Sequence, residues 1–403
     1  METALRAFLI AAAVIVAFFV GASVGQRSDD VGDFAGNLVG DSNDAELSSE
    51  AVDVIDESYF REVDQDELED ASVRGMVDML RKRYNDRFSH YFSPEEYSDF
   101  QTLTSGRFSG VGLTVNEVKQ GLRIATVFSD SPANEAGIQE GDIVTAVDGK
   151  SIAGKDADLA TGQIKGEAGT PVILTVLRPS TKKTRDYELE RRELIVPAVE
   201  TKLEMADGKP VGYIKLLGFS RGAHAELRQA VEKLDGRGAE GLIVDLRGNG
   251  GGLLDEAVLT SSVFVEDGTI VSTKGRTQPD KTFEAAGDAV EPRPTVVLIN
   301  GDSASASEIF TAALKDAGVA DVVGEKSFGK GVFQEVISLE NGGALDITVG
   351  EYLTRDGVSL AGDGIEPEIP SVDKPKTKPD EGLQGALDAL GAALNQSSSS
   401  PQQ

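Results

Sequence analysis

Apolar residues in the second half of the chain come in short runs, and each run is followed by a turn rich in small residues. Residues 295–300 (TVVLIN) form one such run, bounded by Pro294 and Gly301, and it predicts a buried strand. After the turn, residues 304–314 have helix-forming composition and apolar positions at helical spacing. Strand, turn and helix in this order predict an α/β fold for this half of the chain.

The turn between this strand and this helix carries three candidate nucleophiles. The chain has no cysteine and two histidines, so covalent catalysis would need a serine paired with a lysine whose pKa is lowered by burial. Ser303 fits the position that caps a helix, and Ser307 would lie inside the first turn. Ser305 lies between them and leaves the backbone N–H of Ala306 free to bind an oxyanion. Spacing alone does not choose between the three serines.

A lysine lies at the start of a further alternating segment. Polar and apolar positions alternate in residues 328–337 as in a strand, which predicts that Lys330 and Gln334 share one face. The Gln334 amide would then hold the Lys330 amine in place. Gly329 and Gly331 flank the lysine and allow close approach of the backbone. The alternative interpretation of this segment is an ordinary surface lysine.

A glycine-rich turn supplies possible hydrogen-bond donors for the same site. Residues 241–246 predict another buried strand, and residues 248–252 (GNGGG) follow it. Backbone N–H groups of such a turn bind an oxyanion or a phosphate. Neither the phosphate-loop pattern nor the dinucleotide-binding pattern is present in this turn. An oxyanion hole is therefore the favoured interpretation.

These blocks carry a family resemblance. Asp245–Gly252, Gly301–Ile309 and Phe328–Gln334 resemble the signature blocks of the C-terminal processing peptidases, also called tail-specific proteases. The resemblance extends over about residues 45–370. It implies a multidomain α/β (α+β) protein, with a ClpP/crotonase-like α/β catalytic core and an inserted PDZ domain. It also implies a serine endopeptidase that cleaves unstructured C-terminal regions of proteins and uses no cofactor and no metal.

The resemblance assigns roles to individual residues. It makes Ser305 the nucleophile, Lys330 the general base and Gln334 the group that orients the lysine. Free lysine titrates near ~10.4, so a neutral base at pH 7 requires a pKa lowered by about two to three units, which burial can supply. The oxyanion would be bound by one N–H from each of two turns: Ala306, and either Gly252 or Gly251.

A second module, between residues 107 and 177, resembles a PDZ domain. Ser109–Val115 is a glycine-containing turn that enters a strand, Ser131–Ile138 is a short capped helix, and Gly141–Gly149 is a strand that ends in an Asp-Gly turn. In a PDZ domain a peptide adds to the sheet as a strand, and its C-terminal carboxylate binds backbone N–H groups. The alternative is a small β domain that only braces the protease. The carboxylate-binding N–H groups would be those of Val111, Gly112 and Leu113.

Composition excludes several other functions. The 403 residues exceed a single core, so two to three domains are expected. The formal net charge of −29 argues against binding nucleic acid, and against binding an anionic membrane through the folded surface. The absence of cysteine rules out a disulfide framework.

The N-terminus indicates where the protein acts. Ala7 to Val24 is an uninterrupted run of 18 apolar and small residues, preceded by Arg6. We favour an uncleaved single-pass anchor in the cell membrane over a cleaved signal peptide, because the run has no strong cleavage site. In either case the catalytic body is expected outside the cytoplasm, or secreted if the segment is cleaved.

The chain is therefore expected to act on the C-terminal tails of protein substrates. The helical N-terminal region would either pair two copies in a homodimer or brace the same chain, and an activating partner is a further expectation. The alternatives are a PDZ-based adaptor with an inactive or partner-gated protease domain, and a different Ser-Lys acyl hydrolase. The predicted segments are 1–27 (anchor or signal), 28–44 (linker), 45–103 (helical N-terminal region), 104–192 (PDZ domain), 193–370 (peptidase domain) and 371–403 (flexible tail).

Overall fold

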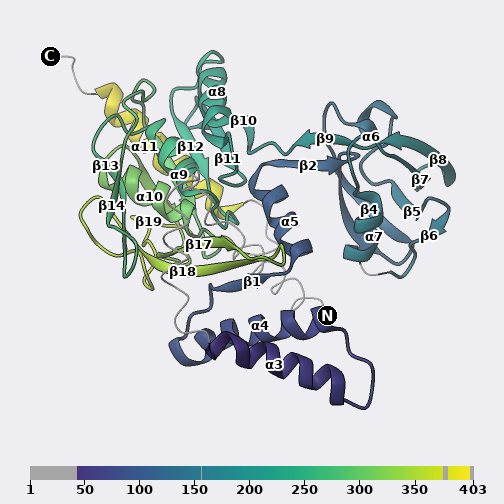
Figure 1. Cartoon of the computed structure of the whole chain (residues 1–403). Coiled ribbons are helices and arrows are strands. Elements are labelled where there is room, and N and C mark those ends of the chain that lie inside the picture. Colours follow the sequence, from purple (N-terminus) through teal and green to yellow (C-terminus); the bar gives the residue numbers. More distant parts are fainter. Residues whose placement is uncertain (1–42, 156, 375–379, 400–403) are drawn as a thin grey trace. The chain divides into compact units, whose positions relative to one another are not determined.

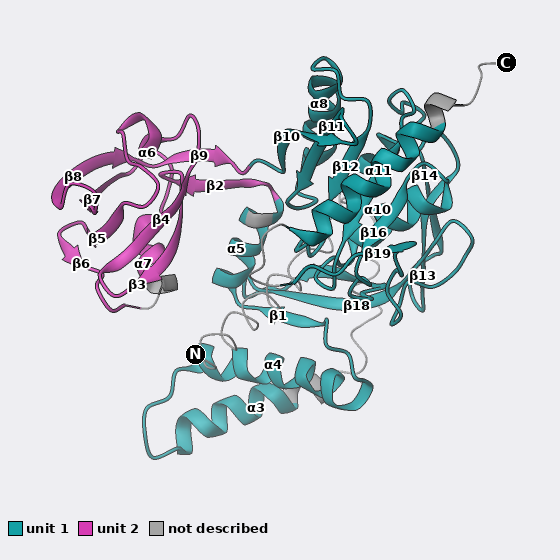
Figure 2. Cartoon of the chain, turned by 180° about the vertical axis from the view of Figure 1, so that it is seen from behind, with its two compact units in different colours: residues 1–104, 197–403 teal, residues 105–196 magenta. Residues whose placement is uncertain are grey.

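The computed structural model describes residues 43–155, 157–374 and 380–399. It forms two compact units, which are coloured separately in Figure 2. The first consists of residues 1–104 and 197–403, and the second of residues 105–196. The second unit thus ends four residues beyond the predicted boundary at 192, because β9 (Arg192–Ile195) pairs with β2 (Arg107–Gly110) inside it.

The first unit is built on a six-stranded sheet. Its first two strands are antiparallel, and every later pair of neighbours is parallel. The strands predicted over 241–246 and 295–300 are its centre, and every residue of both is buried. A central parallel strand is covered on both faces, which explains their continuous apolar runs. In sheet order the strands are β10 (Val199–Ala206), β11 (Lys209–Leu216), β12 (Leu242–Asp245), β15 (Thr295–Ile299), β16 (Asp321–Gly324) and β19 (Ile369–Pro370).

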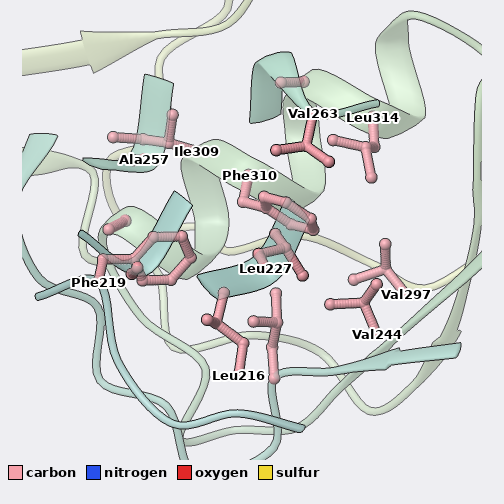
Figure 3. Packing of buried hydrophobic residues seen from close by; sticks show 14 of the residues in the cluster. Leu216, Phe219, Leu227, Val244, Ala257, Val263, Val297, Ile309, Phe310 and Leu314 are labelled. Carbon is pink, nitrogen blue, oxygen red and sulfur yellow. The ribbon is translucent and has the colours of Figure 1, made fainter. Parts of the chain in front are cut away.

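Three helices cover one face of this sheet. Helices α8 (Ala223–Asp235), α9 (Leu254–Ser262) and α10 (Ala306–Asp316) contribute their apolar side chains to one core with alternate residues of the strands. Figure 3 shows this packing around Phe310 of α10, with Val297 of β15. Because α10 follows β15 directly and packs back on the sheet, the turn between them is held at a fixed place beside the sheet.

Helix α11 (Glu381–Ser399) covers the opposite face, so the predicted tail 371–403 is not flexible throughout, and the weak helix that the sequence of Leu383–Leu394 favours is part of a longer, packed helix. Figure 1 shows the helix in yellow, beside the central strands. Its buried residues Ala386, Leu390 and Leu394 pack against the strand residues that point away from α8, α9 and α10. Without α11, that apolar face of the sheet would be exposed to water, which favours the packed helix.

A second sheet completes the first unit. In it β18 (Ala344–Leu353) pairs with β1 (His90–Phe92), β13 (Thr269–Gly275) and β17 (Val332–Ser338), and β14 (Lys281–Glu284) pairs with β13. The predicted helical region 45–103 therefore also supplies a strand. Its helices are α3 (Asn43–Ser58), α4 (Gln65–Tyr84) and α5 (Pro94–Thr104).

The second unit has its own core beneath a six-stranded sheet. Apolar residues of the sheet and of the helices α6 (Pro132–Glu135) and α7 (Ala157–Ile164) form that core. The order β3-β4-β5-β7-β8 leaves β3 at an edge, and β6 pairs with β5. The strands are β3 (Leu113–Val118), β4 (Gly121–Val127), β5 (Ile143–Val147), β6 (Lys150–Ser151), β7 (Pro171–Arg178) and β8 (Lys183–Glu190).

The predicted membrane segment, Ala7 to Val24, lies outside the described residues. Among the helices that the structure does describe, none has both the length and the apolar character needed to cross a membrane.

Candidate active site

The structure separates the three candidate serines by what their hydroxyl groups contact. The Ser303 hydroxyl donates to the carbonyl of Leu246 at 2.8 Å and accepts from the N–H of Asn300 at 3.0 Å. The Ser307 hydroxyl donates to the carbonyl of Asn249 at 2.8 Å. Both side chains tie the serine turn to neighbouring segments, so neither hydroxyl is free to react.

Ser305 differs from the other two in side chain and in backbone. Its Oγ is buried and has no hydrogen-bond partner among the described residues. Its backbone has φ 57° and ψ −113°, in a region that residues other than glycine rarely adopt. Ser305 caps α10, so its hydroxyl lies at the positive end of that helix. Strained, helix-capping geometry of this kind is typical of a residue presented for reaction.

Lys330 is held in the loop that precedes β17. The prediction that it lies within the strand is wrong, because β17 begins at Val332. The residue is 1 % exposed, and its amine has no hydrogen-bond partner in the described chain. Instead, Nζ lies 5.1 Å from the centre of the Phe88 ring. Burial lowers the pKa of Lys330, and the neighbouring carboxylates, Asp346 first, oppose this shift.

Close backbone packing around the lysine explains one of its flanking glycines. A Cβ on Gly331 would lie 1.9 Å from the backbone nitrogen of Ala361. Any side chain larger than hydrogen would therefore push the lysine loop away from the segment beside it. This confirms the predicted close approach of the backbone.

Glu308 joins the serine turn to the lysine loop, and the sequence analysis missed it. One carboxylate oxygen accepts from the N–H groups of Ser305 and Lys330, both at 2.9 Å. The other accepts from the N–H of Gly329 at 2.7 Å and the hydroxyl of Ser327 at 2.5 Å. Burial raises the pKa of Glu308, and these four donors act against that shift. The spacing Ser305-x-x-Glu308 is that of a capping box, a signal that could have identified it.

Gln334 is in the same buried region, but its amide does not hydrogen-bond the lysine amine. The residue is 2 % exposed, and its Nε2 donates to the hydroxyl of Thr348 at 3.2 Å. That hydroxyl in turn donates to the carboxylate of Asp86 at 3.1 Å. A register shift between Phe333 and Gln334 interrupts the strand alternation on which the predicted contact depended.

The glycine turn lies against the serine turn. A Cβ on Gly251 would lie 2.9 Å from the nitrogen of Ala306, so the two backbones touch here. The N–H of Gly251 donates to the side chain of Asn249 at 2.9 Å and is not free. Within the described ranges, no hydrogen bond uses the N–H of Gly252 or of Ala306. These two groups are the available donors for an oxyanion.

The candidate peptide-binding turn is in the second unit. Gly112 has φ +83°, and a Cβ there would lie 2.2 Å from that of Ser131, so glycine is required. The carbonyl of Val111 accepts from Ala133 at 3.0 Å, which fixes the turn on α6. In the part of the chain described, the N–H groups of Val111 and Gly112 are in no hydrogen bond, and Leu113 begins the edge strand β3.

Among the described residues, no group of three histidine or carboxylate side chains has the arrangement of metal ligands.

Comparison with known proteins places the two units in known families. The sequence pattern of peptidase family S41 matches residues 210–371, and that of the PDZ domain matches residues 109–189. The chain is 37 % identical over 317 residues to a carboxy-terminal-processing protease of Bartonella bacilliformis, covering 77 % of this chain and 71 % of that one. It is 36 % identical over 326 residues to a probable CtpA-like serine protease of Staphylococcus aureus, covering 80 % of this chain and 64 % of that one.

A solved structure of a C-terminal processing protease is also similar to this chain. The photosystem II D1 C-terminal processing protease matches with a TM-score of 0.50 and 27 % identity, and the match covers 87 % of this chain and 98 % of that one.

Proposed function

Because the chain belongs to the carboxy-terminal-processing proteases of peptidase family S41 and is a serine-type peptidase with a PDZ domain, we propose that Ser305 and Lys330 carry its reaction. The observation that supports this most is the free, buried Ser305 hydroxyl. The hydroxyl lies on a strained turn, next to the free N–H of Ala306. The Glu308 carboxylate joins this turn to the lysine loop, because it accepts from the backbone N–H groups of both Ser305 and Lys330. The proposed substrates are unstructured C-terminal regions of extracytoplasmic proteins.

Catalysis begins with lysine in its neutral form. Neutral Lys330 takes the proton of the Ser305 hydroxyl as Oγ attacks the substrate carbonyl carbon. The carbonyl oxygen becomes negatively charged and is bound by the N–H groups of Ala306 and Gly252. The ammonium of Lys330 then gives its proton to the leaving amine as the peptide bond breaks. Water attacks the ester on Ser305, again with Lys330 as base, and restores the free serine.

Proton transfer from Ser305 to Lys330 requires the two side chains to move closer together than they are in this structure. The Ser305 hydroxyl and the Lys330 amine are not hydrogen-bonded to each other, whereas proton transfer needs a separation of about 3 Å. Gln334 does not hydrogen-bond the amine either, because its Nε2 binds Thr348 and its Oε1 has no hydrogen-bond partner in the described chain. This observation favours a second candidate function, a peptide-binding protein whose protease unit is inactive or is gated by a partner.

The PDZ unit would supply the substrate. Strand β3 is at the edge of its sheet, with backbone groups available to an added peptide strand. At the start of that strand, the terminal carboxylate would bind the N–H groups of Val111, Gly112 and Leu113. The turn itself contains no charged side chain that could bind these N–H groups instead.

The cellular setting stays a proposal that rests on sequence. The apolar run Ala7 to Val24 would anchor the chain in the cell membrane, with the catalytic body outside the cytoplasm. A homodimer and an activating partner belong to the same proposal, as does a ClpP/crotonase-like class for the catalytic core.

The test compares cleavage of one unfolded reporter by the full chain and three variants. Ser305→Ala and Lys330→Ala are expected to abolish cleavage, whereas Ser180→Ala, an exposed serine and the control, should retain it. A reporter with an amidated C-terminus should be cleaved less well than one with a free apolar C-terminus. Activity that survives Ser305→Ala would refute the proposed nucleophile. Binding of the free end without cleavage by the wild type would support the adaptor function instead.

A further inference from the structure

Buried polar atoms without hydrogen-bond partners gather around Lys330. Among the side chains that the structure describes in the first unit, every such atom belongs to the two proposed catalytic residues, to Gln334, to His90 or to Asp346. Asp346 is the least expected of them. It is 0 % exposed, and neither of its carboxylate oxygens has a partner. A buried carboxylate without donors is costly, so the charge state of this group requires an explanation.

Strand register places Asp346 on the face of the sheet that carries Gln334. Asp346 lies opposite Val336 of β17, and Thr348 lies opposite Gln334 on the same two strands. Residues two apart on a strand, and residues directly opposite one another, point to the same face. On the other side of β18, the direct partner of Asp346 is His90. The side chain of Asp346 therefore points to the same buried side of the sheet as Gln334, and not to the surface.

Burial has opposite effects on the two charged groups of this site. It lowers the pKa of Lys330 and raises the pKa of Asp346, because in both cases it disfavours the charged form. The attraction between ammonium and carboxylate acts against both shifts. No ion pair between the two side chains forms in the described structure. Burial therefore favours the amine with the carboxylic acid, and the mutual attraction favours the ammonium with the carboxylate.

This inference rests on Lys330 as the proposed general base. From the burial, the register and the missing partners, we propose that Lys330 and Asp346 titrate as one coupled pair, which holds a single proton at neutral pH without a hydrogen bond between the two side chains in this geometry. In one arrangement the proton is on Nζ, and the pair is an ammonium and a carboxylate. In the other, Nζ has lost its proton and a carboxylate oxygen has gained one, so the pair is an amine and a carboxylic acid. The net charge of the pair is zero in both.

As a consequence, Lys330 can become a neutral base while the net charge of the pair stays at zero. When Asp346 holds the proton, Lys330 has a free lone pair and can accept the proton of Ser305. Asp346 touches no reacting atom in this scheme, so it is a positioning residue for the proton. The other titratable groups that face the pair are Asp86, from the segment before β1, His90 of β1, Glu308 of α10 and Tyr352 of β18.

Three of these neighbours, Asp86, His90 and Tyr352, each stay in one protonation state at neutral pH. Four donors hold the carboxylate of Asp86, and hydrogen bonds from them help to lower its pKa. Burial lowers the pKa of His90 to about 4, so it is neutral at pH 7. Burial raises the pKa of Tyr352, which stays protonated.

The experiment follows the Lys330 amine directly by nuclear magnetic resonance of the full chain labelled with ¹⁵N at lysine Nζ. Lys330→Met identifies the signal. In the wild type the signal should titrate in two steps, because the pair loses two protons in succession. In Asp346→Asn it should titrate in one step, with a midpoint lower by about one pH unit, since the carboxylate no longer stabilises the ammonium. Glu351→Gln removes a carboxylate from the same strand and should leave the curve unchanged.

An unchanged or higher midpoint in folded Asp346→Asn would overturn the proposal. If that variant does not fold, the carboxyl carbon of Asp346 in the ¹³C-aspartate-labelled wild type gives a second test. It should titrate in the same two steps as Lys330, and a single step near 3.9 would also overturn the proposal. Neither readout needs substrate cleavage. A protein that shows the coupled titration but does not cleave would therefore refute the proposed function and leave the shared proton standing.

Discussion

The Ser305 turn is held by a carboxylate and not by its own side chain. Glu308 accepts from the backbone N–H of Ser305 and from that of Lys330, so one residue sets the positions of both proposed catalytic groups. A carboxylate has the acceptors for all four donors around it, whereas an amide has one oxygen and two N–H groups that would oppose backbone N–H groups. A substitution of Glu308 should therefore change both the positions of Ser305 and Lys330 and the free energy of unfolding.

Glu308→Gln is expected to lower kcat by about 10- to 100-fold, because a displacement near 1 Å at a catalytic group has effects of this size. The KM should stay nearly constant, since Glu308 does not contact the substrate. The free energy of unfolding should fall by about 1–3 kcal/mol through the lost acceptors. Steady-state kinetics and chemical denaturation measure both, with exposed Glu340→Gln as the control. An unchanged kcat in the folded variant would contradict the role assigned to Glu308.

The buried Lys330 also predicts how activity depends on pH. The base must be neutral, and burial lowers the pKa of Lys330. Activity should therefore be lost as the pH falls through a midpoint well below ~10.4, the pKa of free lysine. A pH profile of kcat/KM on a reporter without titratable groups measures this midpoint. An acidic limb that ends near pH 4 would instead point to a carboxylate as the base.

At the scale of elements, each catalytic turn is fixed by helices packed on the central sheet. Arg247, just after β12, binds the carboxylates of Asp245 and Asp380, each at 2.7 Å. Asp380 immediately precedes α11, so this arginine links the start of the glycine-rich turn to the C-terminal helix. Helix α11 is therefore part of the support for the site, and its loss should affect the whole first unit.

Leu390→Ala tests the packing of α11. Leu390 is fully buried between the helix and the sheet, and removing such a side chain costs about 2–5 kcal/mol. A lower melting temperature is expected for the transition of the first unit. Asp388→Ala, two residues away and exposed, should leave the melting temperature nearly unchanged. Equal effects of the two substitutions would show that α11 does not pack as described.

At the scale of the whole molecule, charge affects which tails approach. The chain carries a formal net charge of −29, so the protein attracts cationic segments and repels anionic ones at long range. Because the Debye length is about 10 Å at 0.1 M salt, this effect weakens quickly as salt is added.

The kcat/KM for a reporter with a lysine-rich tail should therefore fall as salt rises from about 10 to 300 mM, and that for a glutamate-rich tail should rise. The change should appear in KM, because the chemistry at Ser305 is the same for both. A neutral reporter serves as the control. Parallel salt responses of the two charged reporters would exclude long-range attraction as the cause.

The local order of residues was enough to predict much of this protein. The buried strands at 241–246 and 295–300 were identified because apolar runs bounded by glycine and proline need no distant contact to be recognised. The PDZ segments and the roles of Ser305, Lys330 and Gln334 came from the family resemblance of short motifs, because spacing alone left the choice of serine open. The assignment to C-terminal processing peptidases is confirmed by the comparisons.

Contacts between distant residues decided the rest. Which serine is free depends on Leu246 and Asn249, more than fifty positions away, because their carbonyls engage the other two hydroxyls. The packed α11 depends on a sheet face that exists only once the strands have assembled. The place of Asp346 on the buried face that carries Gln334 depends on strand register and on burial, and no local pattern encodes either of them. Sequence therefore determined which chemical groups are present, and tertiary structure decided which of them are free, buried and close enough to act together.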